Sequence, residues 1–410
     1  MKSIDVHIEN QKVGELFFEK EKNQYGFNYI KDFKPISLIM PYKNSTYIWK
    51  YKLHPIFDMN IPEGYLFEIF KNYLTKEYGY IDDFLVFSYL CTNIESRITY
   101  KSWFSSEEFK SIDIDEVLHN DTPDTFEKIL KTFLTRNAIS GIQPKTLALL
   151  EDKSSLSTKE YIIKTWGDEY PQLALNEYFC LQSVEKAGVK IPSIKLSKNS
   201  KFLLVERFNY DRSLGIFMGF EEVLVLMGKN RDEKYSGSYE AVAKLIYAVT
   251  TNKTISMKSL YKTIVMSYLL KNGDAHLKNF GVLYDNEMKL ISFAPAYDIV
   301  NTSVYIYKDR PALTMFGQKV WFGKKELLKF GVGCCYLSAA DAKNSYEECI
   351  NALKESIYDL EQYLHNKKES SDFQDIGNKM LDSWKFSLEE KKHKELPNEI
   401  IRNWSKNKRA

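Results

Sequence analysis

Histidine and cysteine, the residues from which metal sites and disulfide frameworks are built, are scarce in this sequence. Only six His and five Cys occur in 410 residues. The His residues, at positions 7, 54, 119, 276, 365 and 393, are scattered without metal-ligand spacing, so no zinc site is expected. Cys334 and Cys335 are adjacent, which disfavours a disulfide between them, and no C-x-x-C pair occurs. Reduced thiols in a cytoplasmic protein are the simplest interpretation.

Long apolar runs and an excess of one charge are also missing. No run approaches the roughly 18 to 20 apolar residues of a membrane span, and residues 1–7 contain no apolar core of a secretory signal. We therefore expect a soluble protein without a membrane partner. Lys and Arg number 57 against 55 Asp and Glu, for a net charge of +2. This balance gives no case for direct nucleic-acid binding.

The sequence does contain enough apolar material for a large folded core. Hydrophobic residues make up 44% and aromatic residues 14%, which excludes a disordered chain. Because 410 residues exceed the usual size of a single core, we expect two lobes. Residues 1–135 are predicted to form an N-terminal cap and connector. Within it, alternating apolar residues predict an antiparallel sheet over 4–48, and helical spacing follows over 62–90.

The rest of the chain divides into a sheet lobe and a helical lobe. Short β-branched strands, interrupted by one helix beginning near Leu173, occupy residues 136–208. Residues 209–410 are predicted to be mainly helical, starting with a helix over 220–228. The last 45 residues are rich in Lys and Glu and predict a surface helix and a frayed tail. The expected fold class is α+β.

The segment Lys271–Phe280, which reads KNGDAHLKNF, is the most informative stretch. Asp274 and Asn279 stand five positions apart, which is the spacing of the protein-kinase catalytic loop. In that loop the Asp accepts the proton of the substrate hydroxyl and the Asn holds a magnesium ion. Asp298 follows an apolar strand pattern at 290–293 and can bind magnesium from the opposite side. Asp274 is the predicted catalytic residue, and Asn279 and Asp298 are the predicted magnesium ligands.

Each of these residues also has a structural interpretation. Asp274 could cap a following helix, since Asp is a favoured N-cap and Gly273 precedes it. Asp298 could be an ordinary turn residue at the end of a strand. His276 could make only a structural hydrogen bond to backbone, and Lys278 could be a surface residue. The joint spacing favours catalysis, because it places a proton acceptor and two oxygen ligands close together.

Residues upstream form a candidate nucleotide site. Segment 140–145, SGIQPK, predicts a strand-turn-strand in which small residues let backbone N–H groups approach phosphates. Lys164 lies near the end of a strand like the kinase strand whose Lys pairs with phosphates, or is an edge-strand charge that deters aggregation. Strand 202–208 is apolar and then turns polar near its end. In a two-lobed kinase this is where the hinge between the lobes offers backbone groups to adenine. Glu177 is either the partner of the strand lysine or a solvated acid on a helix face.

Together these motifs resemble the HipA family of bacterial serine/threonine kinases, the toxin halves of type II toxin–antitoxin systems. The resemblance covers nearly the whole chain. Five segments occur in the family's order, and although each alone is a weak signal, the series is highly specific. They are HPIFDMNIPEG at 54–64, SGIQPK at 140–145, VERF at 205–208, NGDAHLKNF at 272–280 and PAYDI at 295–299.

The resemblance implies an enzyme that uses ATP and Mg²⁺ to phosphorylate a Ser or Thr of a protein. Known targets of the family are aminoacyl-tRNA synthetases, whose inactivation halts translation and growth. The implied partner is a small helix-turn-helix antitoxin, through which any DNA contact would mainly be made. Matched to the family, the nucleotide-binding residues are Ser140, Gly141, Ile142, Gln143, Pro144, Lys145, Lys164, Glu206, Arg207, Phe208, His276, Leu277, Lys278, Asn279, Tyr297 and Asp298.

The sequence departs from the family pattern at two places. Family members with an autophosphorylated Ser often have it three residues before the loop Gly, where this chain has Ala138. Ser140 is then the remaining hydroxyl and the candidate for autophosphorylation. The frequent R-F-D-R of the family has Asn209 in place of its Asp here, so a substrate-side carboxylate has moved to Asp211 if it is present at all.

Two other functions fit the same motifs. A small-molecule or lipid kinase is a rival, because fold and motif set phosphoryl transfer but not the acceptor. A non-catalytic, nucleotide-holding co-repressor is a second rival from another class. The presence of Asp274, Asn279 and Asp298 together argues against an inert scaffold, which has no physical need for all three.

Overall fold

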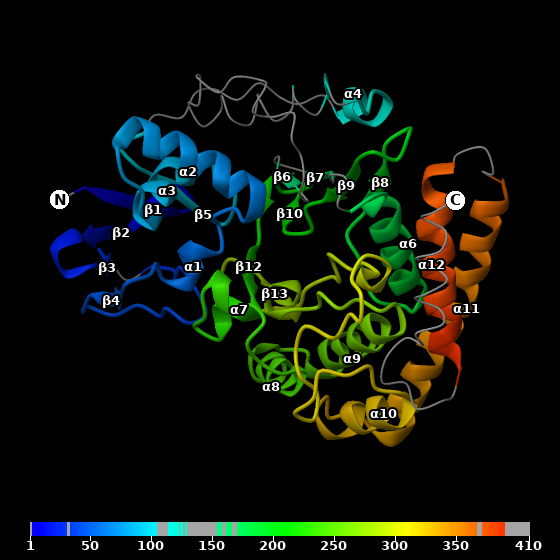
Figure 1. Cartoon of the computed structure of the whole chain (residues 1–410). Coiled ribbons are helices and arrows are strands. Elements are labelled where there is room, and N and C mark those ends of the chain that lie inside the picture. Colours follow the sequence, from blue (N-terminus) through cyan, green and yellow to red (C-terminus); the bar gives the residue numbers. More distant parts are fainter. Residues whose placement is uncertain are drawn as a thin grey trace. The chain divides into compact units, whose positions relative to one another are not determined.

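The computed structural model describes residues 2–30, 33–104, 114–122, 124–125, 128, 154–157, 161–165, 170–366 and 371–389. The chain forms two compact units that interleave in sequence, and Figure 1 labels their elements. The first unit comprises Met1–Glu169, Lys195–Lys234 and Leu283–Leu290, and the second comprises Tyr170–Ile194, Tyr235–Val282 and Ile291–Ala410. The expected α+β class is confirmed, since the first unit carries the N-terminal sheet and the second is largely helical.

A five-stranded antiparallel sheet opens the first unit. Its strands, in the order β4-β3-β2-β1-β5, are β4 (Tyr47–Lys50), β3 (Gln24–Tyr29), β2 (Gln11–Glu19), β1 (Ser3–Ile8) and β5 (Ile98–Lys101). Ile4, Val6 and Ile8 on β1 are fully buried, as the alternation predicts. Glu9 and Asn10 connect β1 to β2 and both have positive φ, the conformation of a tight hairpin turn.

Helices cover the core of this sheet. They are α1 (Pro55–Asp58), α2 (Gly64–Tyr78) and α3 (Asp83–Leu90), and α4 (Ile114–His119) follows later in the chain. Asp82 caps α3 by accepting a hydrogen bond from the backbone N–H of Leu85 at 2.7 Å. Phe57 and Phe87 place their ring centroids 5.7 Å apart within the core. The sheet and helices predicted for 4–48 and 62–90 are therefore confirmed.

A second sheet in the first unit has the order β6-β7-β9-β8. Its strands are β6 (Ser154–Ser157), β7 (Tyr161–Thr165), β9 (Leu203–Glu206) and β8 (Ile194–Leu196). The elements that follow β9 along the chain are β10 (Tyr210–Asp211), β11 (Ile216–Phe217), β12 (Gly219–Glu222) and α7 (Val223–Leu226).

The prediction of a helix over 220–228 is wrong for the first residues of this segment. Residues Gly219–Glu222 form a strand, and only Val223–Leu226 are helical. Glu221 is fully buried in this strand, and its carboxylate accepts hydrogen bonds from Ser37 Oγ, the Leu38 N–H and the Tyr284 hydroxyl at 2.7–2.8 Å. These partners are distant in sequence, and a short apolar run does not by itself distinguish strand from helix.

Six helices dominate the second unit. They are α6 (Leu173–Lys186), α8 (Tyr239–Val249), α9 (Lys253–Leu269), α10 (Lys324–Gly333), α11 (Ala339–Asn366) and α12 (Ser371–Leu388). Helix α11 packs against α6, α9, α10 and α12, and Figure 1 shows α11 beside α12. Strand β13 (Gly281–Tyr284) crosses the boundary between the units in sequence, and β14 (Ile291–Phe293) follows it.

The surface helix predicted near the C-terminus is in fact a core helix. Helix α12 buries Phe373, Ile376, Met380 and Trp384, each at most 3% exposed. These residues recur three or four positions apart and form one apolar stripe, which the abundance of Lys and Glu conceals in the sequence. The predicted frayed tail after residue 389 lies outside the described residues. Within the described ranges, no helix is both long and apolar enough to cross a membrane.

Candidate active site

Helix α9 leads directly into the segment that carries Asp274. Most of its residues from Ser256 to Leu269 are buried. The chain leaves the helix through Lys271, whose φ of 60° is left-handed. The Asn272 N–H donates to the Ser267 carbonyl at 2.8 Å and the Lys271 N–H to the Tyr268 carbonyl at 3.4 Å. This is the Schellman pattern of helix termination, here with Lys at the position that usually holds Gly.

The loop after α9 is fixed by contacts from distant segments. The Gly273 N–H donates to the Thr302 hydroxyl at 2.6 Å, and that hydroxyl lies 2.5 Å from Asp309 Oδ2. A Cβ at Gly273 would lie 2.2 Å from Asp309 Oδ2, so any other residue there would displace the Asp309 carboxylate. The Tyr239 hydroxyl donates to the Ala275 carbonyl at 3.1 Å. The backbone on both sides of Asp274 is thus held in place.

The Asp274 carboxylate is reachable from solvent. Its side chain is 36% exposed, and Oδ1 accepts a hydrogen bond from the Tyr235 hydroxyl at 2.8 Å. His276 Nε2 lies 4.0 Å from the same oxygen. Asp274 is not a helix cap, because the following 3-10 turn Leu277–Asn279 has His276 at its N-cap. The capping interpretation of Asp274 is therefore wrong.

Asn279 and Asp298 lie together although nineteen positions separate them in sequence. The Asn279 Nδ2 donates to Asp298 Oδ2 at 2.8 Å, and Asn279 Oδ1 accepts from the His276 N–H at 2.9 Å. Asn279 is buried, which fixes its orientation. Asp298 has a φ of 55°, a left-handed conformation that is uncommon outside glycine and often accompanies functional sites.

These two side chains suit a magnesium ion. Amide and carboxylate oxygens are the hard ligands that Mg²⁺ prefers, and it usually takes one or two protein carboxylates with phosphates and waters completing the shell. Asn279 Oδ1 accepts one hydrogen bond and has a second lone pair. Across the described part of the chain no group of three or more His, Cys, Asp or Glu could hold a metal. A site at Asn279 and Asp298 therefore requires the nucleotide to supply further ligands.

The residues between Asp274 and Asn279 differ in exposure. His276 is buried, and its ring makes an edge contact with Tyr235 at 5.1 Å between centroids. Leu277 is fully buried, so it can reach a ligand only through its backbone. The Tyr297 hydroxyl donates to the Lys278 carbonyl at 2.6 Å and ties the loop to the Asp298 segment.

Asp309 belongs to this site, although no sequence pattern indicates it. Burial chiefly, and the nearby Asp274 carboxylate to a lesser degree, raise the pKa of Asp309 to about 6. Thr302 Oγ1 has one hydrogen and two acceptors in reach, Asp309 Oδ2 at 2.5 Å and the Lys271 carbonyl at 3.1 Å. A protonated Asp309 that donates to Thr302 satisfies all three groups. The Asp309 carbonyl also accepts from Trp321 Nε1 at 2.9 Å.

Of the upstream residues predicted to bind nucleotide, Lys164 and Glu206–Phe208 are described, and they lie in the first unit. Lys164 is on β7, which pairs with β6 on one side and β9 on the other, so the edge-strand interpretation of Lys164 is wrong. Glu206 pairs with Arg212 at 3.2 Å. The Arg207 guanidinium donates to the Glu95 carbonyl at 2.7 Å and lies over the Phe217 ring. Its side chain is thus engaged within the unit.

Other predicted residues have mixed outcomes. The phosphate-loop residues Ser140–Lys145, and Ala138, lie outside the described residues. Glu177 on α6 is 1% exposed, so it is not a solvated helix-face acid. The Phe208 ring packs against Phe220 with centroids 5.3 Å apart. Asp211 Oδ1 accepts from the Ser213 N–H and hydroxyl, and these bonds hold the pKa of Asp211 below its usual range.

Comparison with known proteins gives a consistent result. The family model described as "HipA-like C-terminal domain" matches residues 137–357, and "HipA N-terminal domain" matches residues 4–100. A Haemophilus influenzae protein named "Putative kinase" is 30% identical over 188 residues, covering 41% of this chain and 53% of that protein. The chain thus spans about half the length of this relative. "Putative kinase Y4dM" of Sinorhizobium fredii is 23% identical over 350 residues, 77% of this chain and 81% of that protein.

One solved structure shows the same fold. It is a complex of HipA and HipB of Shewanella oneidensis MR-1 with operator DNA, and the matched chain has a TM-score of 0.66. The match covers 94% of this chain and 97% of that chain at 15% sequence identity. At this identity the likeness concerns the fold.

Proposed function

The chain belongs to the HipA family, whose C-terminal domain model matches residues 137–357 of 410, and from this premise we propose that it is an ATP-dependent protein kinase. It would transfer the γ-phosphoryl group of ATP to a Ser or Thr hydroxyl of a protein substrate. The curated relatives named as kinases support phosphoryl transfer. The nature of the acceptor is our inference.

The observation that carries this proposal is the loop on which Asp274 is accessible while Asn279 and Asp298 lie 2.8 Å apart. Both contacts of the Asp274 side chain, from Tyr235 and His276, are at Oδ1. Oδ2 is therefore the oxygen that would accept the proton of the substrate hydroxyl. Such general-base assistance is worth roughly 10²- to 10⁴-fold, and positioning contributes about as much or more.

Asn279 and Asp298 would hold Mg²⁺. When bound, the ion supplies positive charge that stabilises the phosphate oxygens during transfer. The His276 N–H orients the Asn279 amide, and the Asn279 amide in turn orients the Asp298 carboxylate. These two hydrogen bonds set the directions of both ligands before any ion arrives.

The nucleotide contacts are proposed on the residues assigned above. The backbone of Ser140–Lys145 would cradle the phosphates, and Lys164 would pair with them. The backbone of Glu206–Phe208 would meet the adenine, since the Arg207 side chain is already engaged with Glu95. In the second unit, Lys278 would steady the γ-phosphate as charge develops.

The proposed biological role is that of a toxin in a toxin–antitoxin pair. The protein substrate would be a translation component of the aminoacyl-tRNA synthetase class, and its phosphorylation would arrest growth. The inhibitory partner would be a small helix-turn-helix protein that contacts DNA. The similar fold of a HipA solved with HipB and operator DNA supports such an assembly.

A labelling experiment tests this proposal against its two rivals. The purified chain is incubated with γ-labelled ATP, magnesium and host lysate, and labelled products are identified by mass spectrometry. We expect a labelled protein that is absent with Asp274→Asn. Label confined to small molecules or lipids would indicate a metabolic kinase. Binding of ATP without any turnover would indicate the non-catalytic co-repressor and reject the kinase.

A further inference from the structure

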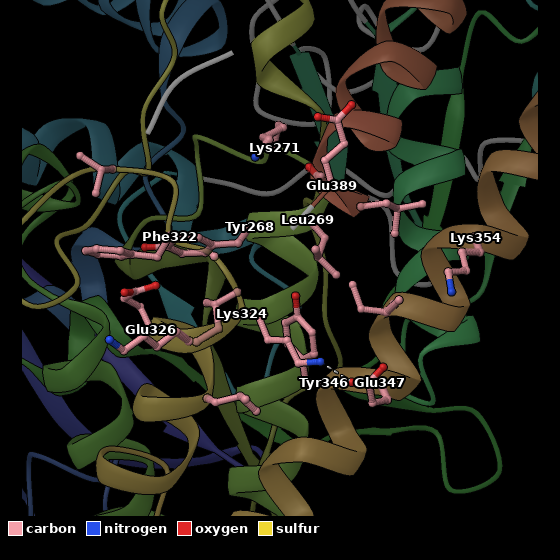
Figure 2. A pocket seen from close by; sticks show the side chains of 18 of the residues that line it. Tyr268, Leu269, Lys271, Phe322, Lys324, Glu326, Tyr346, Glu347, Lys354 and Glu389 are labelled. Atoms are coloured by element: carbon pink, nitrogen blue, oxygen red, sulfur yellow. Dashed lines mark hydrogen bonds and ion pairs between the residues drawn. The ribbon is translucent and has the colours of Figure 1, made fainter. Parts of the chain in front are cut away.

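The second unit contains a cavity whose lining includes none of Asp274, Asn279 and Asp298 and meets the loop that carries Asp274 only at Lys271. Its volume is about 960 Å³, within the size range of small-molecule sites. It is lined by the end of α9, the segment 318–328, α11 and the end of α12. Figure 2 shows these side chains converging on one space.

The interior of the cavity is apolar and aromatic, and its mouth is charged. Tyr268, Leu327 and Tyr346 are buried, while Lys324 and Lys354 are exposed. Such a lining favours a ligand with a flat apolar body that is too large to be an inorganic ion.

One charged side chain lies deep in this wall. Lys271 is 4% exposed, and in Figure 2 its nitrogen is directed toward the side where Tyr268 and Phe322 lie. The contacts of this nitrogen are the faces of Trp321 and Phe386, at 5.0 and 6.0 Å from the ring centroids. In the described part of the chain no carboxylate pairs with it and no acceptor takes its hydrogen bond. A buried ammonium in this state is unfavourable, and ring contacts only partly compensate.

A second element presents positive potential to the same cavity. Helix α10, ten residues long, begins here with Gly323 as N-cap, and Gly323 has no side chain to satisfy the first backbone N–H groups. Such a helix start attracts anions. Of the acids that line the cavity, Glu347 is paired with Lys324 at 2.8 Å, Glu326 is in the first turn of α10 and Glu389 is exposed.

We propose that this cavity binds a small organic anion, with its acid group at the Lys271 ammonium and its apolar body against Tyr268 and Phe322. The anion supplies the acceptor that Lys271 lacks. The aromatic walls select a carboxylate, phosphate or sulfonate carried on a ring system over the free inorganic ion.

Protonation of Lys271 makes this binding dependent on pH. Burial lowers the pKa of Lys271 to about 7, so a bound anion favours the protonated form and the affinity falls as pH rises from 6 to 8. The other titratable groups on the walls are Tyr268 on α9, Lys324, Lys325 and Glu326 on α10, Tyr346, Glu347 and Lys354 on α11, and Glu389 after α12. Side chains of these types ordinarily do not titrate between pH 6 and 8.

A matched pair of probes tests the proposal on the full chain without ATP. 2-Naphthoate and its neutral amide, 2-naphthamide, have the same shape and differ in charge. We expect titration calorimetry at pH 6.5 to give at least tenfold tighter binding of naphthoate, and weaker binding at pH 8. Equal affinities for the two probes, a pH-independent naphthoate affinity, or no naphthoate binding at millimolar concentration would overturn the proposal.

Lysine variants locate the site. Lys271→Met keeps the length of the side chain without its charge and should remove the preference for naphthoate. Lys343→Met, at an exposed position of α11 that does not line the cavity, should leave it intact. A preference unchanged in Lys271→Met would place the anion elsewhere and reject the assignment. If Lys271→Met does not fold, the probe pair and the pH dependence in the native chain still decide. Because the assay measures binding alone, its outcome is independent of the proposed kinase activity.

Discussion

At the scale of single residues, Asp274 has the most direct consequence. Asp274→Asn keeps the size of the side chain and can retain the Tyr235 hydrogen bond, so thermal unfolding should be nearly unchanged. Transfer from labelled ATP should fall by at least the roughly 10²-fold of a lost general base, and growth arrest should be relieved. Asp359→Asn, which removes an exposed ion pair with Lys186, is the control and should keep activity. If the Asp274→Asn variant arrested growth as fully as the native chain, the assignment of Asp274 as the catalytic residue would be rejected.

The magnesium dependence of ATP binding distinguishes a metal-binding role of Asp298 from a purely structural one. Asp298→Asn weakens a carboxylate ligand while an amide still contacts Asn279. We expect loss of transfer, with ATP affinity reduced severalfold more in the presence of magnesium than in its absence. Titration calorimetry in both conditions measures the two affinities. Equal reductions would assign Asp298 to the fold.

The raised pKa of Asp309 predicts that the stability of the fold depends on pH. Its pKa, raised to about 6 by burial with a contribution from Asp274, lies above the value of an unfolded Asp near 3.9. The folded state therefore holds a proton that the unfolded state has lost, and stability decreases as pH rises from about 4 to 6. One pKa unit is about 1.4 kcal/mol, so the decrease is at most about 3 kcal/mol.

Asp309→Asn should remove this decrease, because the amide donates permanently to Thr302 as the protonated acid does. The variant should gain stability relative to the native chain as pH rises through this window. Chemical unfolding of both proteins at pH 4 and pH 7 measures the difference. A constant difference between the two pH values would mean that Asp309 is ionised in the fold.

At the scale of elements, the buried Glu221 of β12 ties three segments of the first unit together. Tyr284→Phe removes the hydroxyl that donates to its carboxylate at 2.7 Å. Leaving a buried acceptor without its partner costs about 1–3 kcal/mol, so the free energy of unfolding should fall by about that amount. Tyr358→Phe, on the exposed face of α11, should change it by less than about 0.5 kcal/mol. Similar small losses in both variants would contradict the role of Glu221.

Sequence periodicity predicted the elements whose pattern is long and local. Helices α8 and α9 and strands β1 to β3 carry their own apolar spacing, and the structure has them. Strand β5 did not stand out, because four residues contain too few repeats to show a period. Helix α12 was assigned to the surface because its composition, unlike its spacing, is polar.

The residues of the candidate site also divide into those that the sequence could predict and those that only the fold brings together. One short loop contains Asp274 and Asn279, so their proximity follows from spacing alone. Tyr235 and Asp309 lie more than thirty positions from Asp274 on either side. The fold alone brings them to it, through the packing of α8 and α9 and the turn at Thr302. Sequence motifs thus indicate the proposed reacting groups, while the groups that orient them require the structure.

At the scale of the whole molecule, regulation is proposed to act on nucleotide binding. A phosphate on Ser140 would add about −1.5 to −2 charges where the phosphates of ATP are proposed to bind. We expect Ser140→Asp to lower ATP affinity severalfold and Ser140→Ala to keep it, as measured by titration calorimetry. Phosphopeptide mapping after incubation with ATP should find phosphate on Ser140. Phosphate found only elsewhere, or none, would remove Ser140 from the mechanism and leave it as a small residue in a tight turn.

Trp321 connects the Asp309 segment of the candidate active site with the Lys271 side chain of the cavity. Its indole N–H donates to the Asp309 carbonyl, and its ring faces the Lys271 ammonium at 5.0 Å. Indole emission responds to nearby charge and to changes in hydrogen bonding, so this ring is a built-in optical reporter for both places. The chain has six Trp, and subtraction of a Trp321→Phe spectrum isolates its signal. Fluorescence titration could then follow ligand entry and the state of the candidate catalytic loop in the unlabelled protein.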